Sequence, residues 1–277
     1  MANNRKRRKR RRHLSTGIII LIIVIAALVI MGLFLLGTYA MGYRISSYTA
    51  EDGTSIKFVG KVDSEGKPTL GSIYVDGVRA KIAEDGSLTY DNGDVYDGEL
   101  NENYMPEGYG KMKYANGDIY EGNFDDGEIS GDGRLDYATG EKYVGHFDKG
   151  GIKSGYGEFT HTDGTVYKGN FASDMKNGEG EYYWADGSSY IGSFVNDKKS
   201  GTGRMVYENG DIYEGDFTDD VRTGKGKYYY INGDVYEGDF VNNEITGEGT
   251  YIFKSGRKFT GTFANGKIVR AEEIEED

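Results

Sequence analysis

The sequence predicts an all-β protein: an elongated single-layer antiparallel sheet of repeated β-hairpins, preceded by one transmembrane α-helix. Three observations lead to this prediction. Glycine and tyrosine are abundant, with 44 and 24 residues in a chain of 277; an aromatic–glycine motif recurs every 23 or 24 residues; and one uninterrupted apolar run lies near the N-terminus. The chain has no cysteine, which excludes disulfides and thiolate metal sites. The low apolar content outside the run favours an extended architecture over a thick globular core.

The apolar run covers residues 18–36 and contains only Ile, Leu, Val, Ala, Met, Phe and one Gly. As an α-helix rising about 1.5 Å per residue, it is close in length to the roughly 30 Å hydrocarbon core of a bilayer. We therefore predict a basic cytoplasmic tail over residues 1–16 and a transmembrane helix over residues 17–42. The alternative is a cleaved signal peptide, with Thr38-Tyr39-Ala40 as a weak cleavage sequence, but the run is longer than a typical signal core.

Charge is distributed unevenly along the chain. The formal net charge is −12, but residues 5–12 are all basic and contribute +8, so the body that follows the apolar run carries −20. These basic residues are Arg5, Lys6, Arg7, Arg8, Lys9, Arg10, Arg11 and Arg12. Because positive charge beside a membrane resists translocation, we expect a single-pass cell-membrane protein with a cytoplasmic N-terminus and an extracytoplasmic body. The basic residues are expected to contact anionic lipid headgroups; nucleic-acid tails and nuclear signals are other uses of such runs.

The body contains eight copies of a motif of the type Tyr-x-Gly-x-Phe. The copies within 209–217 and 232–240 are almost identical, and the other six are looser. The central aromatic residues are Tyr96, Tyr120, Tyr143, Tyr167, Tyr190, Tyr213, Tyr236 and Phe259, and the motif glycines are Gly98, Gly122, Gly145, Gly169, Gly192, Gly215, Gly238 and Gly261. In seven units a Gly-x-Gly pair follows after six or seven residues. Only this connection varies in length, which indicates a surface loop.

Each unit is expected to form a β-hairpin. The named residues of Tyr-x-Gly-x-Phe alternate along the chain and therefore share one face of a strand. The second strand alternates in the same way, as in Gly224, Gly226, Tyr228 and Tyr230. Between one unit and the next, Asn-Gly or Asp-Gly stands in six of eight cases, a dipeptide that favours a two-residue type I′ turn.

The abundance of glycine needs a physical reason, because glycine weakens strands and has no side chain to pack. We expect each motif glycine to leave a hollow over which a neighbouring aromatic ring lies flat, so that a single-layer sheet covers its own backbone. Each aromatic pair then adds about 0.5–1.5 kcal/mol beyond area burial. Most repeat tyrosines are therefore expected to be packing residues rather than ligand contacts.

The unit Tyr213-Glu214-Gly215-Asp216-Phe217, followed by Gly224-Lys225-Gly226 and Asn232-Gly233-Asp234, resembles the MORN (membrane occupation and recognition nexus) repeat. The resemblance covers about residues 92–266, and its eight-fold recurrence makes it specific. It implies an elongated, twisted antiparallel sheet of hairpins, with roles in scaffolding, oligomerisation or protein contacts and, in some members, phospholipid association. The N-terminal anchor and the expected extracytoplasmic repeats disfavour phosphoinositides of the cytoplasmic leaflet as ligands.

Two regions flank the repeats. Residues 43–91 are expected to form a degenerate β capping region that shields the open edge of the first repeat. Within it, Ser55–Val62 is a candidate strand, and Ile73–Val75 with Val78–Ile82 is a candidate hairpin. Residues 267–277 are expected to form an acidic tail that frays from Ala271 onward.

No residue pattern indicates catalysis. The three histidines, His13, His146 and His161, are isolated, and the repeat glycines lack the spacing of dinucleotide- or phosphate-binding loops. We expect no enzyme activity, no cofactor and no metal site, and the acidic body disfavours nucleic acid as a partner. The best-supported function is a non-catalytic membrane-anchored scaffold that binds an unidentified protein partner or a second copy of itself. A glycan- or cell-wall-binding module and a lipid-associating domain are the alternatives.

Overall fold

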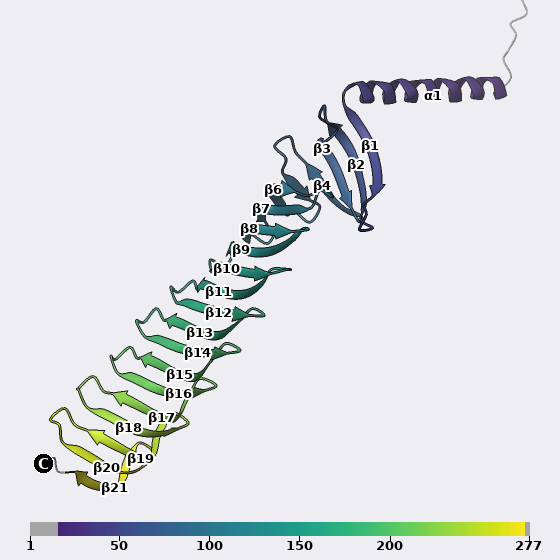
Figure 1. Cartoon of the computed structure of the whole chain (residues 1–277). Helices are drawn as coiled ribbons and strands as arrows, with labels where there is room; N and C mark the ends of the chain where they lie inside the picture. Colours follow the sequence, from purple (N-terminus) through teal and green to yellow (C-terminus); the bar gives the residue numbers. More distant parts are fainter. Residues whose placement is uncertain (1–15, 275–277) are drawn as a thin grey trace, which may run out of the picture. The chain divides into compact units, whose positions relative to one another are not determined.

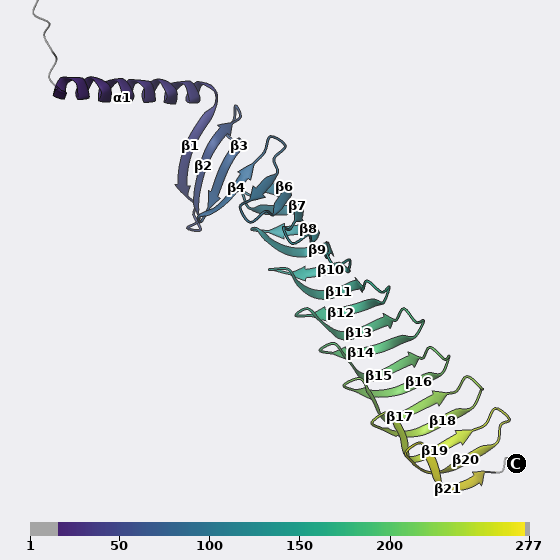
Figure 2. The same ribbon diagram turned by 180° about the vertical axis from the view of Figure 1, so that it is seen from behind.

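The computed structural model describes residues 16–274, which fold into one helix and 21 strands (Figures 1 and 2). These residues divide into two compact units between Gly86 and Ser87. Within each unit, every strand pairs antiparallel with its neighbours in sequence. This arrangement confirms the predicted fold class, a mostly β open sheet of hairpins with one N-terminal apolar helix.

The first unit consists of α1 (Thr16–Ala40) and the strands β1 (Tyr43–Thr49), β2 (Ser55–Val62), β3 (Pro68–Val75) and β4 (Val78–Ile82). The strands pair in the order β1–β2–β3–β4. The sequence predicted β2 and β4 with these bounds and only the end of β3, and it did not predict β1.

The helix α1 is apolar along its length. Its segment Ile23–Ala40 is long and apolar enough to cross a membrane. Membrane anchors and signal sequences both contain an apolar helix of this kind. The helix is therefore compatible with either role. Large side chains of this segment are exposed, including Phe34 and Leu36, which are each 68% accessible.

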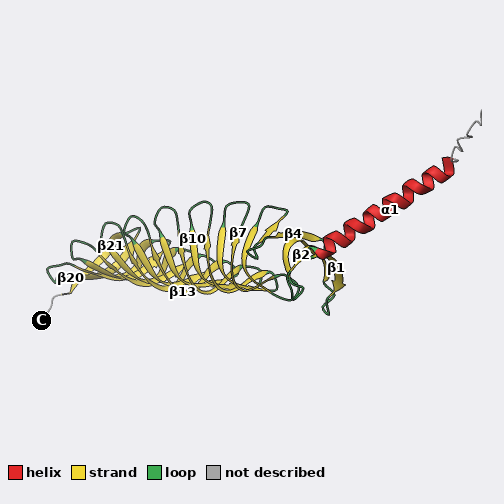
Figure 3. Ribbon diagram, turned by 90° about the horizontal axis from the view of Figure 1, so that it is seen from above, coloured by secondary structure: helices red, strands yellow, loops and turns green. Residues whose placement is uncertain are grey.

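The second unit is a continuous series of hairpins in which successive strands lie side by side, with turns along both edges (Figure 3). Its strands are β5 (Leu88–Tyr90), β6 (Val95–Leu100), β7 (Pro106–Lys113), β8 (Ile119–Asp125), β9 (Glu128–Asp136), β10 (Lys142–Asp148), β11 (Ile152–Thr160), β12 (Val166–Ala172), β13 (Met175–Tyr183), β14 (Ser189–Val195), β15 (Lys198–Val206), β16 (Ile212–Thr218), β17 (Val221–Tyr229), β18 (Val235–Val241), β19 (Glu244–Ile252), β20 (Lys258–Ala264) and β21 (Lys267–Ile274). Each repeat therefore contributes two strands.

The two edges of this unit use different turns. Within most repeats the turn has two residues at positive φ, such as Asp126 at 51° and Gly127 at 87°, which is the type I′ geometry. Between repeats the loop has three residues, and only its glycine, such as Gly117 at 98°, takes a positive φ. There Tyr114 N–H donates to the Asp118 carbonyl, and Gly117 N–H donates to the Tyr114 carbonyl. The type I′ prediction for the Asn-Gly and Asp-Gly dipeptides is therefore wrong, because a three-residue loop needs only one left-handed residue.

The connection whose length varies between repeats lies at the edge of the sheet that carries the type I′ turns. It is a loop, as its variation in length predicted. Residues 101–105 and 149–151 form the two longer loops there. At the C-terminal end, β21 pairs with β20 along its length, from Ala264↔Lys267 to Lys258↔Ile274. The expected fraying from Ala271 is thus wrong for residues 271–274, because their backbone groups complete the hydrogen bonds of β20.

Candidate binding surface

The motif tyrosines lie directly over glycines. Each ring covers the motif glycine of its own strand and the second glycine of the next Gly-x-Gly pair. A Cβ atom placed on Gly215 would lie 2.5 Å from Tyr213 Oη, and one on Gly226 would lie 2.6 Å from Tyr213 Cε2. The rings in this position are Tyr96, Tyr120, Tyr143, Tyr167, Tyr190, Tyr213 and Tyr236, and none is more than 1% exposed. We call the face of the sheet that carries these rings the inner face.

The hydroxyl groups of these tyrosines are satisfied internally. Each Oη donates to the backbone carbonyl three residues later, as Tyr213 does to Asp216 at 3.1 Å. Burial raises the pKa of Tyr96, Tyr213 and Tyr236 to about 12. These residues are therefore neutral core groups, and none offers a free polar atom to a ligand.

The same tyrosines build a continuous ladder with the motif phenylalanines. Each tyrosine contacts the phenylalanine of the next repeat, edge to face. All but Tyr96, whose strand carries Leu100 at that position, also contact the phenylalanine of their own strand. The Tyr213 ring centroid lies 5.2 Å from that of Phe217 and 4.9 Å from that of Phe240, with interplanar angles of 89° and 76°. The ladder runs from Tyr96 to Phe263. It joins each repeat to the next without a second layer of structure.

The eighth motif aromatic, Phe259, does not join the ladder. Its partner glycine, Gly261, is opposite Ala271 rather than a second glycine, so a methyl group is present where the other repeats have only hydrogen. Phe259 is instead half-buried, 5.7 Å from Phe253 and 4.4 Å from the Arg257 guanidinium. The sequence grouped Phe259 with the seven tyrosines, and the structure separates it from them.

A second line of side chains on the inner face is partly exposed. One residue per repeat, immediately before the inter-repeat turn, contributes to it. We call it the aromatic row: Tyr114, Tyr137, His161, Trp184, Tyr207, Tyr230 and Phe253. Four of these rings pack beside the ring two residues earlier in the chain, with Trp184 4.5 Å from Tyr182 and Tyr230 4.7 Å from Tyr228. Sequence reasoning placed them on this face without identifying them as a surface, although their spacing of 23 or 24 residues was an available signal.

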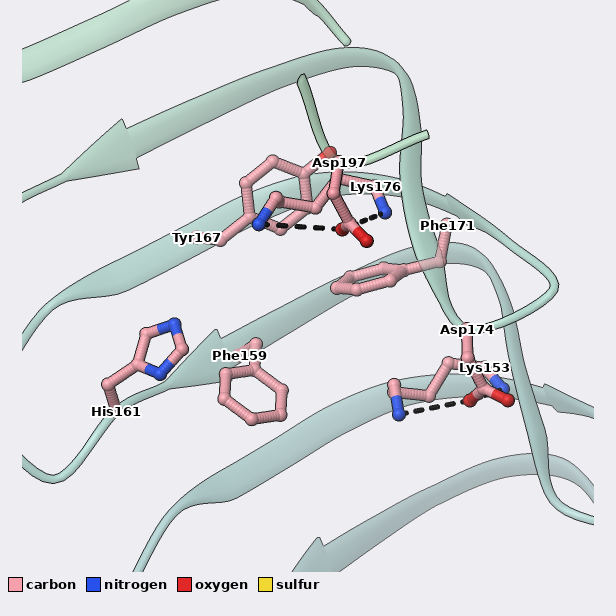
Figure 4. A pocket seen from close by; sticks show the side chains of 8 residues that line it. All are labelled: Lys153, Phe159, His161, Tyr167, Phe171, Asp174, Lys176 and Asp197. Carbon is pink, nitrogen blue, oxygen red and sulfur yellow. Dashed lines mark hydrogen bonds and ion pairs between the residues drawn. The ribbon is translucent and has the colours of Figure 1, made fainter. Parts of the chain in front are cut away.

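Four central repeats place a cation on the inner face, at Lys153, Lys176, Lys199 and Arg222. The Lys176 ammonium lies 5.8 Å from the Tyr167 ring centroid and 5.3 Å from that of Tyr182, and it pairs with Asp197 at 3.5 Å (Figure 4). Its side chain is only 21% exposed. These cations therefore act mainly as ties within the sheet.

The acceptor for each cation lies on the type I′ turn of the next repeat. Asp197, at φ 71°, also accepts the backbone N–H of Lys176 at 2.9 Å. Asp174, Asp220 and Asn243 accept equivalent bonds from the backbone N–H groups of Lys153, Lys199 and Arg222. A side chain at this turn thus links consecutive repeats at one edge of the sheet.

Within residues 87–274, three hollows open on the inner face beside the aromatic row; one, of about 410 Å³, lies at its C-terminal end between Phe253 and Phe259, and the other two are central. One of these two, of about 190 Å³, lies between Phe159, His161 and Phe171 and is bordered by the ion pairs of Lys153 and Lys176 (Figure 4). The other, of about 500 Å³, is lined by Trp184, Met205, Tyr207 and Tyr228 and by the turn residues Asp186 and Glu208. No basic side chain lines this second hollow.

The inter-repeat turns beside the aromatic row are acidic. From residue 91 to residue 234 they carry aspartate or glutamate and no lysine or arginine. Hydrogen bonds from the Ser188 hydroxyl and N–H lower the pKa of Asp186. The opposite, outer face differs, because its charges pair across strands, as in Arg204–Glu214 at 3.1 Å. Between residues 91 and 234, the inter-repeat turns beside the aromatic row therefore carry acidic groups and no lysine or arginine of their own.

The two histidines among residues 16–274 do not form a site together. The basic residues Arg5, Lys6, Arg7, Arg8, Lys9, Arg10, Arg11 and Arg12 lie outside the described residues. His146 bonds to Asp132 at 2.9 Å and His161 to Glu141 at 3.3 Å, at separate places. Among residues 16–274, no cluster of three potential metal ligands occurs.

The solved structures to which the chain is similar include three with low TM-scores. The TCP domain of SAS-4 from Drosophila melanogaster, in complex with a proline-rich motif of Ana2, is 16% identical with a TM-score of 0.24, over 84% of this chain and 90% of that one. A streptogramin B lyase is 14% identical with a TM-score of 0.15, over 79% and 90% of the two chains. Virginiamycin B lyase from Staphylococcus aureus is 12% identical with a TM-score of 0.14, over 84% of each chain. Likenesses at these TM-scores carry no argument about function, and a search of curated proteins found no significant match.

The family comparison is decisive. The MORN repeat model matches seven consecutive segments: 96–119, 120–142, 143–166, 167–189, 190–212, 213–235 and 236–256. Each begins at a tyrosine of the buried ladder, and together they cover more than half of the chain. The chain therefore belongs to the MORN repeat family.

Proposed function

We propose that the protein is a non-catalytic scaffold, anchored in the cell membrane by α1, whose extracytoplasmic repeats bind a protein partner through the inner face. The observation that carries this proposal is the aromatic row. Within residues 87–274, each strand contacts its sheet neighbours, and no further layer covers this row. Partly exposed aromatic side chains gathered on one face are typical of interaction surfaces. Exposed Phe253, at 38%, extends the row toward the C-terminal end.

The membrane part of the proposal rests on the junction between α1 and β1. The Arg44 guanidinium stacks on the Tyr39 ring at 3.7 Å and donates to the carbonyls of Tyr39 and Tyr43. Tyrosine and arginine side chains at the end of an apolar helix are typical of the membrane–water interface. The candidate cleavage triplet lies inside the last turn of α1, which supports a retained anchor rather than a removed signal.

The absence of native cysteine allows a direct test of orientation. A single cysteine introduced at exposed Ser47 should react with a membrane-impermeant maleimide on intact cells. Reaction only after the membrane is permeabilised would contradict the extracytoplasmic placement. A shortened, unanchored product in the soluble fraction would contradict the retained anchor.

The binding surface is tested by site-specific photo-crosslinking in the full-length protein. A photoreactive phenylalanine analogue at Tyr230, in the aromatic row, should form adducts with a protein partner. The same analogue at Tyr156, exposed by 66% on the outer face, is the matched control and should form few adducts. Adducts from the outer face alone would overturn the proposed surface. Retention on cell-wall polysaccharide or on vesicles, without protein adducts, would instead favour the glycan or lipid alternative.

A further inference from the structure

We infer that the inner face binds a cationic, proline-rich segment of its partner in the polyproline II conformation, lying across the strands with one helical turn per repeat. This inference rests on the proposed function and names the chemistry of the partner. Three properties of the inner face support it: the spacing of the repeats, the hollow between Trp184 and Tyr207, and the charge of the adjoining turns.

The spacing of the aromatic row matches one ligand conformation. Neighbouring strands lie about 4.8 Å apart, so two strands per repeat place successive row residues roughly 9.6 Å apart. A polyproline II helix has three residues per turn and rises about 3.1 Å per residue, so equivalent side chains recur about every 9.3 Å. An extended β-strand repeats its facing side chains about every 6.7 Å, and an α-helix turns about every 5.4 Å. Only the polyproline II helix presents the same face to each repeat in turn.

The hollow between Trp184 and Tyr207 suits a proline ring. Trp184, Tyr207 and Tyr228 form its aromatic walls, and Met205 with the polar residues Asp186, Ser188, Glu208 and Asn209 completes its lining. Aromatic-lined grooves are the usual receptors of polyproline II segments. Such a ligand also exposes unpaired carbonyl groups, because its backbone forms no internal hydrogen bonds. The Trp184 indole N–H and the Tyr230 hydroxyl make no side-chain hydrogen bond within the described chain, and both can donate to those carbonyls.

The negative charge of the inter-repeat turns favours a cationic partner. Asp186 and Glu208 are exposed, line the hollow, and have no basic side chain among its lining residues. Of the cations nearest the hollow, Lys199 is already paired with Asp220, and Arg222 lies against the Tyr207 and Tyr228 rings, where it donates to the Asn243 carbonyl. A basic residue at every third position of the ligand would face successive acidic turns, and complementary charge of this kind raises association rate and specificity.

The test measures binding of three synthetic peptides to the full-length protein in nanodiscs. The probe contains five Pro-Pro-Arg triplets. One control contains five Gly-Ser-Arg triplets, with equal charge and no polyproline II preference, and the other contains five Pro-Pro-Glu triplets. The probe is expected to bind at least about tenfold more tightly than either control, a difference of about 1.4 kcal/mol. Equal affinity for the Gly-Ser-Arg peptide would overturn the inference, because charge alone would then explain binding.

A pair of double variants locates the site. Asp186→Asn with Glu208→Gln should weaken probe binding about tenfold, since it removes two charges and retains the hydrogen-bond acceptors of the turn. Asp219→Asn with Glu244→Gln removes two exposed charges from the opposite edge and should leave probe affinity unchanged. Equal effects of the two double variants would overturn the inference. Failure of the peptides to bind while Tyr230 still crosslinks to a protein would refute the polyproline partner and leave the proposed scaffold function intact.

Discussion

Replacing Gly215 with valine should destabilise the repeats far more than the same replacement at the adjacent position. A Cβ atom at Gly215 would lie 2.5 Å from Tyr213 Oη and 2.7 Å from both Gly226 Cα and the Lys225 carbonyl oxygen. Two of these contacts are with backbone, so the strands cannot accommodate the side chain locally. The Tyr213 ring must leave its place, or β16 and β17 must separate.

Both outcomes remove the same interactions. Displacing Tyr213 exposes a ring that is 0% accessible, at about 1.5–3 kcal/mol for a large side chain. It also breaks two edge-to-face contacts, at about 0.5–1.5 kcal/mol each, and a hydrogen bond to Asp216 worth about 1 kcal/mol. The higher strand propensity of valine offsets at most ~1 kcal/mol of this loss of stability. We therefore expect a loss of about 3–5 kcal/mol, or roughly 10 °C in melting temperature for an array of this size.

The control is Glu214→Val in the same strand, where the side chain is exposed and pairs with Arg204 at 3.1 Å. Loss of a surface ion pair costs about 0.2–1 kcal/mol, so this variant should melt within about 3 °C of the original protein. Thermal unfolding of the full-length protein in detergent, followed by circular dichroism, measures both. Equal melting temperatures for the two variants would refute the account of glycine given above.

Three further predictions follow from the same packing. Burial raises the pKa of Tyr213 from 10.0 to about 12, so the unfolded state releases the proton first, and stability present below pH 10 is lost as pH rises toward 12. The part of the tyrosinate absorbance that is lost in Tyr213→Phe should therefore rise together with the loss of circular dichroism, and a rise of that part before unfolding would contradict this. Asp197→Ala should lower the melting temperature more than Asp197→Asn, because asparagine keeps an acceptor for the Lys176 N–H, at a difference of about 1 kcal/mol; equal melting would refute the tie between repeats. Phe259→Tyr with Ala271→Gly should extend the ladder and slow amide exchange in β20, whereas Phe259→Tyr alone should not, and equal exchange in both would show that Ala271 is not the obstacle.

Much of the fold could be predicted because its determinants are local and repeated. The alternation in Tyr213-Glu214-Gly215-Asp216-Phe217 defines a strand and its faces, and the period of 23 residues defines how strands follow one another. The pairing of tyrosine rings with glycines followed from the need to cover a single-layer sheet. The structure shows this pairing in the seven tyrosine repeats and in Phe58 of β2, whose ring lies over Gly60.

The parts that were missed depend on residues distant in sequence. Phe259 leaves the ladder because of Ala271 on the next strand, which a motif comparison does not detect. The turn geometry was assigned to the wrong edge, because the register of the paired strands, rather than the dipeptide, sets the loop length. The aromatic row and the buried ladder lie on the same face with the same period, so alternation does not distinguish exposed Phe253 from buried Tyr236. Only the three-dimensional position of each ring relative to the inter-repeat turn separates them.

Because the contacts between neighbouring repeats are uniform, the length of the array can change by whole repeats. Six of the seven ladder tyrosines contact a phenylalanine of their own repeat and one of the next, and Tyr96, the first, contacts that of the next repeat, so the same contact joins each pair of neighbouring repeats. Duplication of a unit such as 213–235 would add two strands, about 9.6 Å of length, and one more pair of ring contacts, while leaving the other contacts unchanged. The near-identical stretches 209–217 and 232–240 provide matched sequences for such a recombination event. The distance that the array extends can therefore change by whole repeats in a single genetic step.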